Sequence, residues 1–328
     1  MTAELKDICK PHSKTVAPSI VASSKLAVDP GVKDMANLIG INLAMQTPFH
    51  KGGSIDFSRW DKLLDQYLET GMHGFVLSSG TGQHAYLTED ECNKLFEAGV
   101  KRINGRASVT AQTSALNLQE VIRRSKAAQD AGVDALMILP PFFEGPKHDD
   151  GIFAFYEAIC KEVSIDVIGY NIPAATGIEL TPKLYTRLLQ LDNFNFIKDS
   201  SGDLCKQQAL VACGGNILNG ADPNAPFSFM LGTAGTIWGC ANIFPREAVR
   251  LFELIDGGHH AEGLKLWQSM FPIVAYCWQN DYIPAVKAAA RQMGFDGGTV
   301  RAPVCEVGAE EEAKIAAALK PLQLEKAA

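Results

Sequence analysis

Eight short apolar runs alternate along the chain with amphipathic segments of helical period. The runs are residues 39–47, 74–79, 107–113, 135–140, 166–172, 193–199, 216–220 and 235–241. Strands that are buried on both faces read as nearly continuous apolar runs, so this pattern is typical of a parallel sheet. Repeated strand–helix units predict an α/β fold, and eight of them favour a (β/α)8 TIM barrel over a doubly wound sheet.

The segments between the runs carry helix signals. In residues 57–68 the apolar side chains recur every three or four residues, which places them on one helical face. Three residue pairs are typical of helix starts: Thr88 with Glu91, Asn117 with Glu120, and Thr181 with Pro182. Further helices are predicted near residues 261–277, 282–294 and 308–320.

The pattern divides the chain into three parts. Residues 1–38 have no sustained period, and we expect them to form an irregular N-terminal extension. Residues 39–256 form the predicted barrel, and residues 257–328 form a C-terminal helical region. A length of 328 residues is usual for a single α/β barrel.

Charge and hydropathy argue against two classes of partner. The net charge is −7, and no cluster of Lys and Arg stands out, so a nucleic-acid partner is not expected. The longest apolar stretch, residues 135–143, is too short to cross a bilayer and contains two prolines, so no membrane partner is expected either. The N-terminus carries both charge signs early and lacks the pattern of a secretory signal.

Cysteine and histidine placement bears on location and metals. The eight cysteines are scattered without a Cys-x-x-Cys pair, which is typical of reduced thiols in a cytoplasmic protein. His259 and His260 are the closest histidine pair, but adjacent residues point in different directions. We therefore predict no metal site.

Lys198 is the most unusual residue of the predicted strands. It follows the apolar residues Phe196 and Ile197 near the end of the sixth run. In a TIM barrel the active site lies at the carboxyl ends of the strands. Burial disfavours an ammonium, and the neutral amine is the form that attacks carbonyls. Position alone does not distinguish this nucleophile from a lysine whose end reaches solvent. For a second lysine, Lys287 in a later helix, a structural role is expected.

Two other strand ends offer partners for Lys198. Tyr170 lies in the fifth run, where its phenol could exchange protons with a substrate. Without a nearby lysine, we would interpret it as barrel packing. Gly80, Thr81 and Gly82 follow the second run, where backbone N–H groups and a hydroxyl could hold a carboxylate. An ordinary loop between a strand and a helix would have a similar sequence.

These motifs, in this order, resemble the dihydrodipicolinate synthase / N-acetylneuraminate lyase family over about residues 39–324. The matching stretches are Thr47-Pro48-Phe49 with Gly53-Ser54, Gly80-Thr81-Gly82-Gln83, Tyr170-Asn171-Ile172-Pro173, Phe196-Ile197-Lys198-Asp199, Asn219-Gly220-Ala221-Asp222, Ile283-Pro284 and Arg301-Ala302-Pro303.

The resemblance implies a homotetrameric (β/α)8 barrel that uses no metal or organic cofactor. It implies that Lys198 forms an imine with pyruvate or a related 2-oxo acid, that Tyr170 moves protons, and that Thr81 holds the carboxylate of the 2-oxo acid. The candidate substrate-binding residues are Thr81, Gly80, Gly82, Phe143, Gly220, Ile237 and Trp238.

The chain departs from the synthase pattern at four positions. Ala175 stands where the synthase has the arginine that binds its dicarboxylic aldehyde. Phe143 replaces a tyrosine that reaches across a subunit interface, Gly80 replaces a hydroxyl residue, and Gln83 replaces a glutamate. Together with these changes, Phe142 and Trp238 predict a more apolar pocket, although aromatic residues at a barrel mouth are often packing. A typical dihydrodipicolinate synthase is therefore not expected.

The preferred hypothesis is a class I aldolase that cleaves or forms a 4-hydroxy-2-oxo acid from pyruvate and an aldehyde. One alternative, motivated by Gly80, is a dehydratase of a 2-oxo-3-deoxy sugar acid. Another is a non-catalytic protein that senses a 2-oxo acid. A nucleophilic Lys198 together with Tyr170 and Thr81 argues against the sensor, since a protein that only binds needs no nucleophile.

Overall fold

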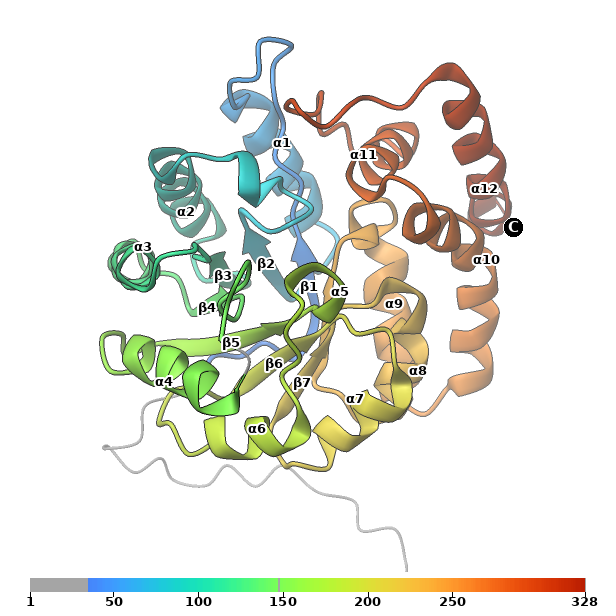
Figure 1. The fold of residues 1–328 in the computed structure, drawn as a ribbon. Coiled ribbons are helices and arrows are strands. Elements are labelled where there is room, and N and C mark those ends of the chain that lie inside the picture. The colour runs from blue at the N-terminus through green and yellow to red at the C-terminus, as the bar shows by residue number, and fades with distance from the viewer. Residues whose placement is uncertain (1–34, 147, 328) are drawn as a thin grey trace, which may run out of the picture. The chain divides into compact units, whose positions relative to one another are not determined.

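Eight parallel strands close into a barrel in the order β1 to β8, and β8 pairs with β1 (Figure 1). The computed structural model describes residues 35–146 and 148–327. The strands are β1 Gly40–Ala44, β2 Gly74–Leu77, β3 Ser108–Gln112, β4 Ala135–Ile138, β5 Asp166–Asn171, β6 Phe196–Asp199, β7 Asn216–Asn219 and β8 Gly235–Trp238. Each lies inside one of the eight predicted runs, so the predicted (β/α)8 barrel is confirmed.

Helices surround the barrel, and three further helices follow it. The helices are α1 Phe57–Leu68, α2 Glu89–Ile103, α3 Leu118–Asp130, α4 Asp149–Cys160, α5 Pro173–Thr176, α6 Pro182–Leu188, α7 Leu204–Val211, α8 Ala225–Met230, α9 Pro245–Asp256, α10 His260–Gln279, α11 Tyr282–Gln292 and α12 Ala309–Ala327. α10 packs against α9, α11 and α12, which forms the C-terminal helical region (orange to red in Figure 1).

The three predicted helix starts are confirmed by hydrogen bonds. Thr88 and Glu91 form a capping box at the start of α2. The Asn117 side chain accepts hydrogen bonds from two backbone N–H groups of α3, and the Thr181 side chain accepts one from Leu184 at the start of α6. Each bond satisfies an N–H group that has no partner within its own helix.

The alternation of side chains along each strand divides the core into two layers. One layer fills the inside of the barrel and includes Val76, Met137, Ile168, Phe196 and Ile237. The other lies between the strands and the surrounding helices and is much larger. Because successive side chains of a strand point to opposite faces, only every second residue can face the barrel interior.

The first described residues close the amino-terminal end of the barrel. Leu38 is buried within the cluster that fills the barrel, and the Ala36 N–H donates to the carboxylate of Asp166. The predicted extension, residues 1–38, otherwise lies outside the described residues. No helix in the described part of the chain is long and apolar enough to cross a membrane.

Lys287 ties the C-terminal region to the barrel. It lies on α11 and is 1% exposed, and its ammonium donates to the carbonyl oxygens of Thr47, Gly297 and Thr299 at 2.7, 3.1 and 2.7 Å. Burial lowers the pKa of Lys287 to about 7, against the charges of Glu306 and Asp296. These hydrogen bonds support the structural role expected for this lysine.

Arg301 connects the C-terminal region to the loop after β2 by hydrogen bonds. The side-chain amide of Gln83 donates to the Arg301 carbonyl oxygen and accepts from the Arg301 N–H. The Arg301 guanidinium donates to both carboxylate oxygens of Glu91, at 2.7 and 2.6 Å. Gln83 therefore shapes the loop that carries Gly80 and Thr81.

Candidate active site

Lys198 points into a cavity at the carboxyl ends of the strands. It pairs in register with Tyr170 on the neighbouring strand β5, and its side chain is 5% exposed. Nζ lies 4.0 Å from the centre of the Tyr170 ring, so the amine rests on the ring face. The cavity measures about 370 Å³, and both residues line it. The structure thus brings together the two residues predicted to be catalytic.

Gly220, which follows β7, makes room for the lysine. A Cβ atom at this position would lie 2.7 Å from Lys198 Cε and would collide with the Ser200 hydroxyl. These distances are shorter than van der Waals contact, so the lysine stem fills space that a side chain at residue 220 would need. Gly220 lines the cavity, as its candidate role requires.

A Gly220→Ala variant tests this fit. We expect its kcat to fall by about 10- to 100-fold, because an ångström of misplacement of a reacting group has effects of this size. The thermal midpoint should change little, since Ser200 and Lys198 can move toward the cavity. Steady-state kinetics and thermal unfolding would be compared with those of Gly214→Ala, where an added Cβ meets open space away from the cavity but must adopt a positive φ of 86°. Full activity in Gly220→Ala would contradict the steric argument.

The loop after β2 brings Thr81 to the cavity. Ser78, directly after the strand, has a positive φ of 49°, a left-handed backbone that ends the extended conformation of the strand. Gly80 and Thr81 line the cavity. Gly82 does not line it: a Cβ there would lie 2.9 Å from both Met45 O and Thr47 Oγ1. Gly82 is therefore needed for the close approach of this loop to the segment after β1.

Trp238 does not line the cavity, which corrects the expectation that it contacts substrate. It is fully buried in the layer between the barrel and the helices, where it packs against Phe244 and Trp267. Its neighbour Ile237 faces the barrel interior and lines the cavity. The physical reason is the alternation of side chains along β8, which prevents adjacent residues from facing the same side.

Phe143 also does not line the cavity. It is 78% exposed in the loop between β4 and α4, with a positive φ of 55°, and it is not among the lining residues. A left-handed backbone is unfavourable for a residue with a bulky side chain. Contact between Phe143 and substrate, in its own chain or across a subunit interface, stays a prediction, as does the homotetramer.

Several lining residues were not singled out from the sequence as site candidates. They are Ala44, Ile172, Ser200, Asp222, Gly239, Trp278, Tyr282 and Ile283. Asp222 follows a strand end, so the rule for barrel sites could have found it. Tyr282 and Trp278 belong to helices that follow the barrel, and no sequence signal indicates that these helices reach its mouth.

Asp222 is buried beside the cavity and accepts hydrogen bonds. Its Oδ2 atom accepts from the Tyr282 hydroxyl and from the Cys240 N–H, the latter at 3.0 Å. Burial raises the pKa of Asp222, and hydrogen bonds from the Cys240 thiol, the Tyr282 hydroxyl and the Cys240 N–H, together with the charge of Lys198, oppose the shift.

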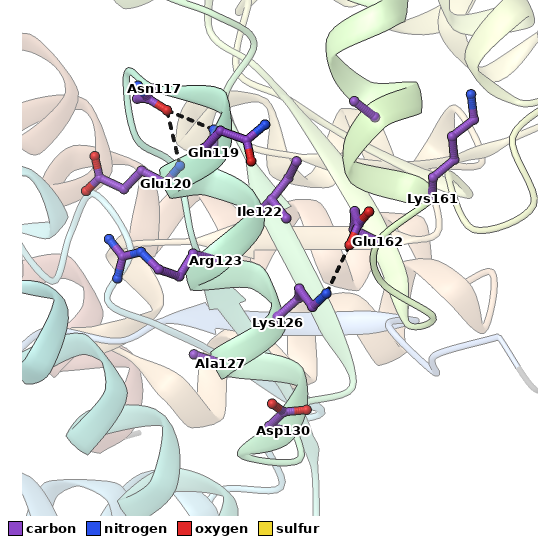
Figure 2. A pocket seen from close by; sticks show the side chains of 11 residues that line it. Asn117, Gln119, Glu120, Ile122, Arg123, Lys126, Ala127, Asp130, Lys161 and Glu162 are labelled. Carbon is purple, nitrogen blue, oxygen red and sulfur yellow. Dashed lines mark hydrogen bonds and ion pairs between the residues drawn. The ribbon is translucent and has the colours of Figure 1, made fainter.

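The surface has two other hollows, one beside this cavity and one on the outer helices. One adjoins it, shares Gly80, Tyr170 and Ile172 with it, and includes Ala175. The other, of about 1100 Å³, lies between α3 and the end of α4, where Lys126 pairs with Glu162 (Figure 2). This second hollow lies on the outer helices, and none of the predicted site residues line it.

Among the described residues, no group of three or more His, Cys, Asp or Glu side chains could hold a metal ion. The seven cysteines in this part of the chain are free thiols. The groups that line the cavity are thus an amine, phenols, hydroxyls and one carboxyl group. Such groups can form a covalent bond with a carbonyl compound and move protons.

The structure is an α/β barrel with a lysine in a cavity at its mouth, and comparison with known proteins gives its family. Residues 37–322 match the dihydrodipicolinate synthetase family. The chain therefore belongs to this family, as the resemblance predicted.

Individual relatives cover nearly all of the described chain. The 4-hydroxy-tetrahydrodipicolinate synthase of Cellvibrio japonicus is 31% identical over 86% of this chain and 98% of the relative. That of Bacillus velezensis is 29% identical over 87% of this chain and 100% of the relative. The crystal structure of the dihydrodipicolinate synthase from Acinetobacter baumannii complexed with pyruvate has a TM-score of 0.83 and 27% identity, and covers 87% of this chain and 99% of that chain.

Proposed function

We propose that this protein is a class I lyase that binds pyruvate, or a related 2-oxo acid, as an imine on Lys198. The observation that carries the proposal is the buried Lys198 amine, which lies in the cavity against the ring of Tyr170. The pyruvate-bound relative from Acinetobacter baumannii supports the choice of 2-oxo acid. Thr81, on the cavity wall, is the proposed partner of the carboxylate.

The proposed reaction is reversible aldol cleavage of a 4-hydroxy-2-oxo acid. The Lys198 amine adds to the C2 carbonyl, and loss of water leaves a protonated imine. The C3–C4 bond then breaks, its electron pair moves toward the imine nitrogen, and an aldehyde leaves as the C4 hydroxyl loses its proton. Protonation of C3 and hydrolysis release pyruvate and the free lysine. We assign the proton movements of imine formation and hydrolysis to Tyr170.

The cavity lining favours an uncharged aldehyde. Ile172, Ile237 and Ile283 contribute apolar surface, and Trp278 adds an aromatic side chain. Lys198 is the one Lys or Arg side chain that the structure describes on the wall of this cavity. Ala175, in the adjoining hollow, cannot bind a carboxylate as an arginine would, and the Arg124 side chain that lines the same hollow is hydrogen-bonded to Glu120. These features favour an aldolase over the synthase reaction, and over dehydration of a polyhydroxylated sugar acid.

Borohydride trapping tests the imine. We expect wild-type protein incubated with pyruvate and borohydride to gain one reduced pyruvate adduct, because reduction makes the imine a stable amine. Intact-mass and peptide analysis should place the adduct on Lys198, and Lys198→Ala should gain none. An adduct that persists in Lys198→Ala, or no adduct on the wild type, would rule out the proposed mechanism.

A substrate panel tests the reaction. Pyruvate release would be measured from the 4-hydroxy-2-oxo acids formed with acetaldehyde, isobutyraldehyde, benzaldehyde and glyceraldehyde. The aldolase proposal expects cleavage of the apolar members to be fastest. Loss of water from a 2-oxo-3-deoxy sugar acid, without pyruvate release from the panel, would favour the dehydratase. Binding of pyruvate without any turnover would favour the sensor.

A further inference from the structure

Tyr282 and Asp222 form a hydrogen-bonded pair on the cavity wall. Tyr282 is the first residue of α11, and Asp222 lies just after β7, 60 residues earlier in the chain. The Tyr282 hydroxyl donates to Asp222 Oδ2, and both side chains line the cavity that contains Lys198. The pair therefore places a phenol and a carboxyl group beside the amine.

The pair lies on the opposite side of Lys198 from Tyr170. β6, which carries Lys198, pairs with β5 on one side and with β7 on the other. Tyr170 lies on β5, whereas Asp222 follows β7. The wall of the cavity thus carries two separate phenols, and the proposed imine chemistry uses only Tyr170.

Gly239 sets the position of the Tyr282 hydroxyl. A Cβ atom at residue 239 would collide with that hydroxyl and would lie 2.7 Å from Thr81 Oγ1. The absence of a side chain at residue 239 thus lets the phenol and the threonine approach the same part of the mouth. α11 packs against the turn formed by Cys240–Asn242, which holds Tyr282 in this place.

The direction of the hydrogen bond gives the phenol a chemical role. Because Tyr282 donates its own proton to Asp222, its oxygen remains free to accept a proton from a bound hydroxyl. Burial and the negative charge of Asp222 both raise the pKa of the Tyr282 phenol, so it does not ionise by itself. A proton that reaches Tyr282 can instead move on to the carboxylate.

We propose that Tyr282 and Asp222 remove the proton of the substrate's C4 hydroxyl during carbon–carbon cleavage, an inference that rests on the proposed aldolase reaction. The C4 O–H proton passes to the Tyr282 oxygen, and the Tyr282 proton passes to the Asp222 carboxylate. The oxygen's electron pair forms the aldehyde carbonyl, and the C3–C4 pair moves to the imine. In the reverse direction the same pair protonates the new alkoxide.

Two variants separate this step from imine formation. Tyr282→Phe keeps the ring and removes the hydroxyl. Asp222→Asn keeps an oxygen that can accept both existing hydrogen bonds, but an amide does not take up the proton. We expect each to lower kcat for cleavage by about 100-fold, as for the loss of a general base. The probe is the panel member that the wild type cleaves fastest.

Exchange of the pyruvate methyl protons is the matched measurement. In D₂O, the imine and its enamine interconvert and replace these protons by deuterium, which proton NMR detects. This exchange needs Lys198 but involves no C4 hydroxyl, so both variants should retain it within about twofold while cleavage is lost. Retained exchange also shows that the variants are folded.

Tyr185→Phe is the control for the loss of a buried phenol. The Tyr185 hydroxyl contacts the carbonyl oxygens of Asn195 and Asn216 outside the barrel. The Tyr185→Phe variant should therefore change neither the cleavage rate nor the exchange rate. Cleavage that stays near the wild-type rate in Tyr282→Phe would overturn the inference, and so would an equal fall in exchange and cleavage. Failure of the imine proposal would look different, because the wild type itself would show neither exchange nor a trapped adduct.

Discussion

Replacement of Lys198 by methionine is expected to lower kcat by at least about 10⁴-fold, because it removes the nucleophile on which every later step depends. The methionine side chain has a similar length and suits an apolar barrel interior, so the protein should fold normally. Pyruvate release from the best panel substrate would be measured, together with the circular dichroism spectrum and the thermal midpoint.

A second variant at this position separates charge from nucleophilicity. Lys198→Arg places a cation beside Tyr170. A guanidinium stays protonated at the pH of the assay, so it does not form an imine with pyruvate. We expect it to be as inactive as Lys198→Met. Lys183→Met, which removes an exposed lysine of α6, should keep wild-type kinetics. Activity of Lys198→Arg above about one hundredth of the wild type would show that charge, not covalent chemistry, matters at this position.

Replacement of Lys287 by methionine is expected to destabilise the fold by about 3–5 kcal/mol. The ammonium satisfies three backbone carbonyl groups from two distant parts of the chain, and methionine would leave all three without this donor. Urea unfolding should therefore occur at a clearly lower concentration.

The pKa of Lys287 in the folded protein determines the pH values at which unfolding should be measured. The folded-state pKa of Lys287 is lowered to about 7, below its ordinary value of 10.5. The unfolded chain thus holds this proton more tightly, and this group makes wild-type stability rise as pH increases from about 7 toward 10.5. Unfolding would be compared at about pH 6, where the amine is charged in both states, and at about pH 9, where it is charged only in the unfolded chain; the destabilisation by Lys287→Met should be larger at the higher pH. In Lys287→Met this part of the pH dependence should disappear.

Lys101→Met provides the control for Lys287. Lys101 is an exposed lysine of α2, and its replacement should change the free energy of unfolding by less than about 0.5 kcal/mol. If Lys287→Met and Lys101→Met unfolded at the same urea concentration, the three hydrogen bonds of Lys287 would contribute nothing to stability.

Ile237 and Trp238 show that the sequence predicts a strand more reliably than it predicts which side chains of that strand face the cavity. Both were expected to contact substrate, but adjacent residues of a strand face opposite sides, and the structure places only Ile237 on the cavity wall. The apolar run around them identifies the strand but not which of its faces points inward. That choice depends on the register between β8 and β1, which pairs Ile237 with Asn42.

The sequence by itself determined the barrel and the strand that carries Lys198, because apolar runs and helix starts are local patterns and active sites of barrels lie at strand ends. Only the tertiary structure decided that Tyr282 meets Asp222 beside that lysine and that Lys287 binds Thr47, 240 residues earlier. These contacts depend on how α11 packs against loops from other parts of the chain, and no local pattern encodes such packing.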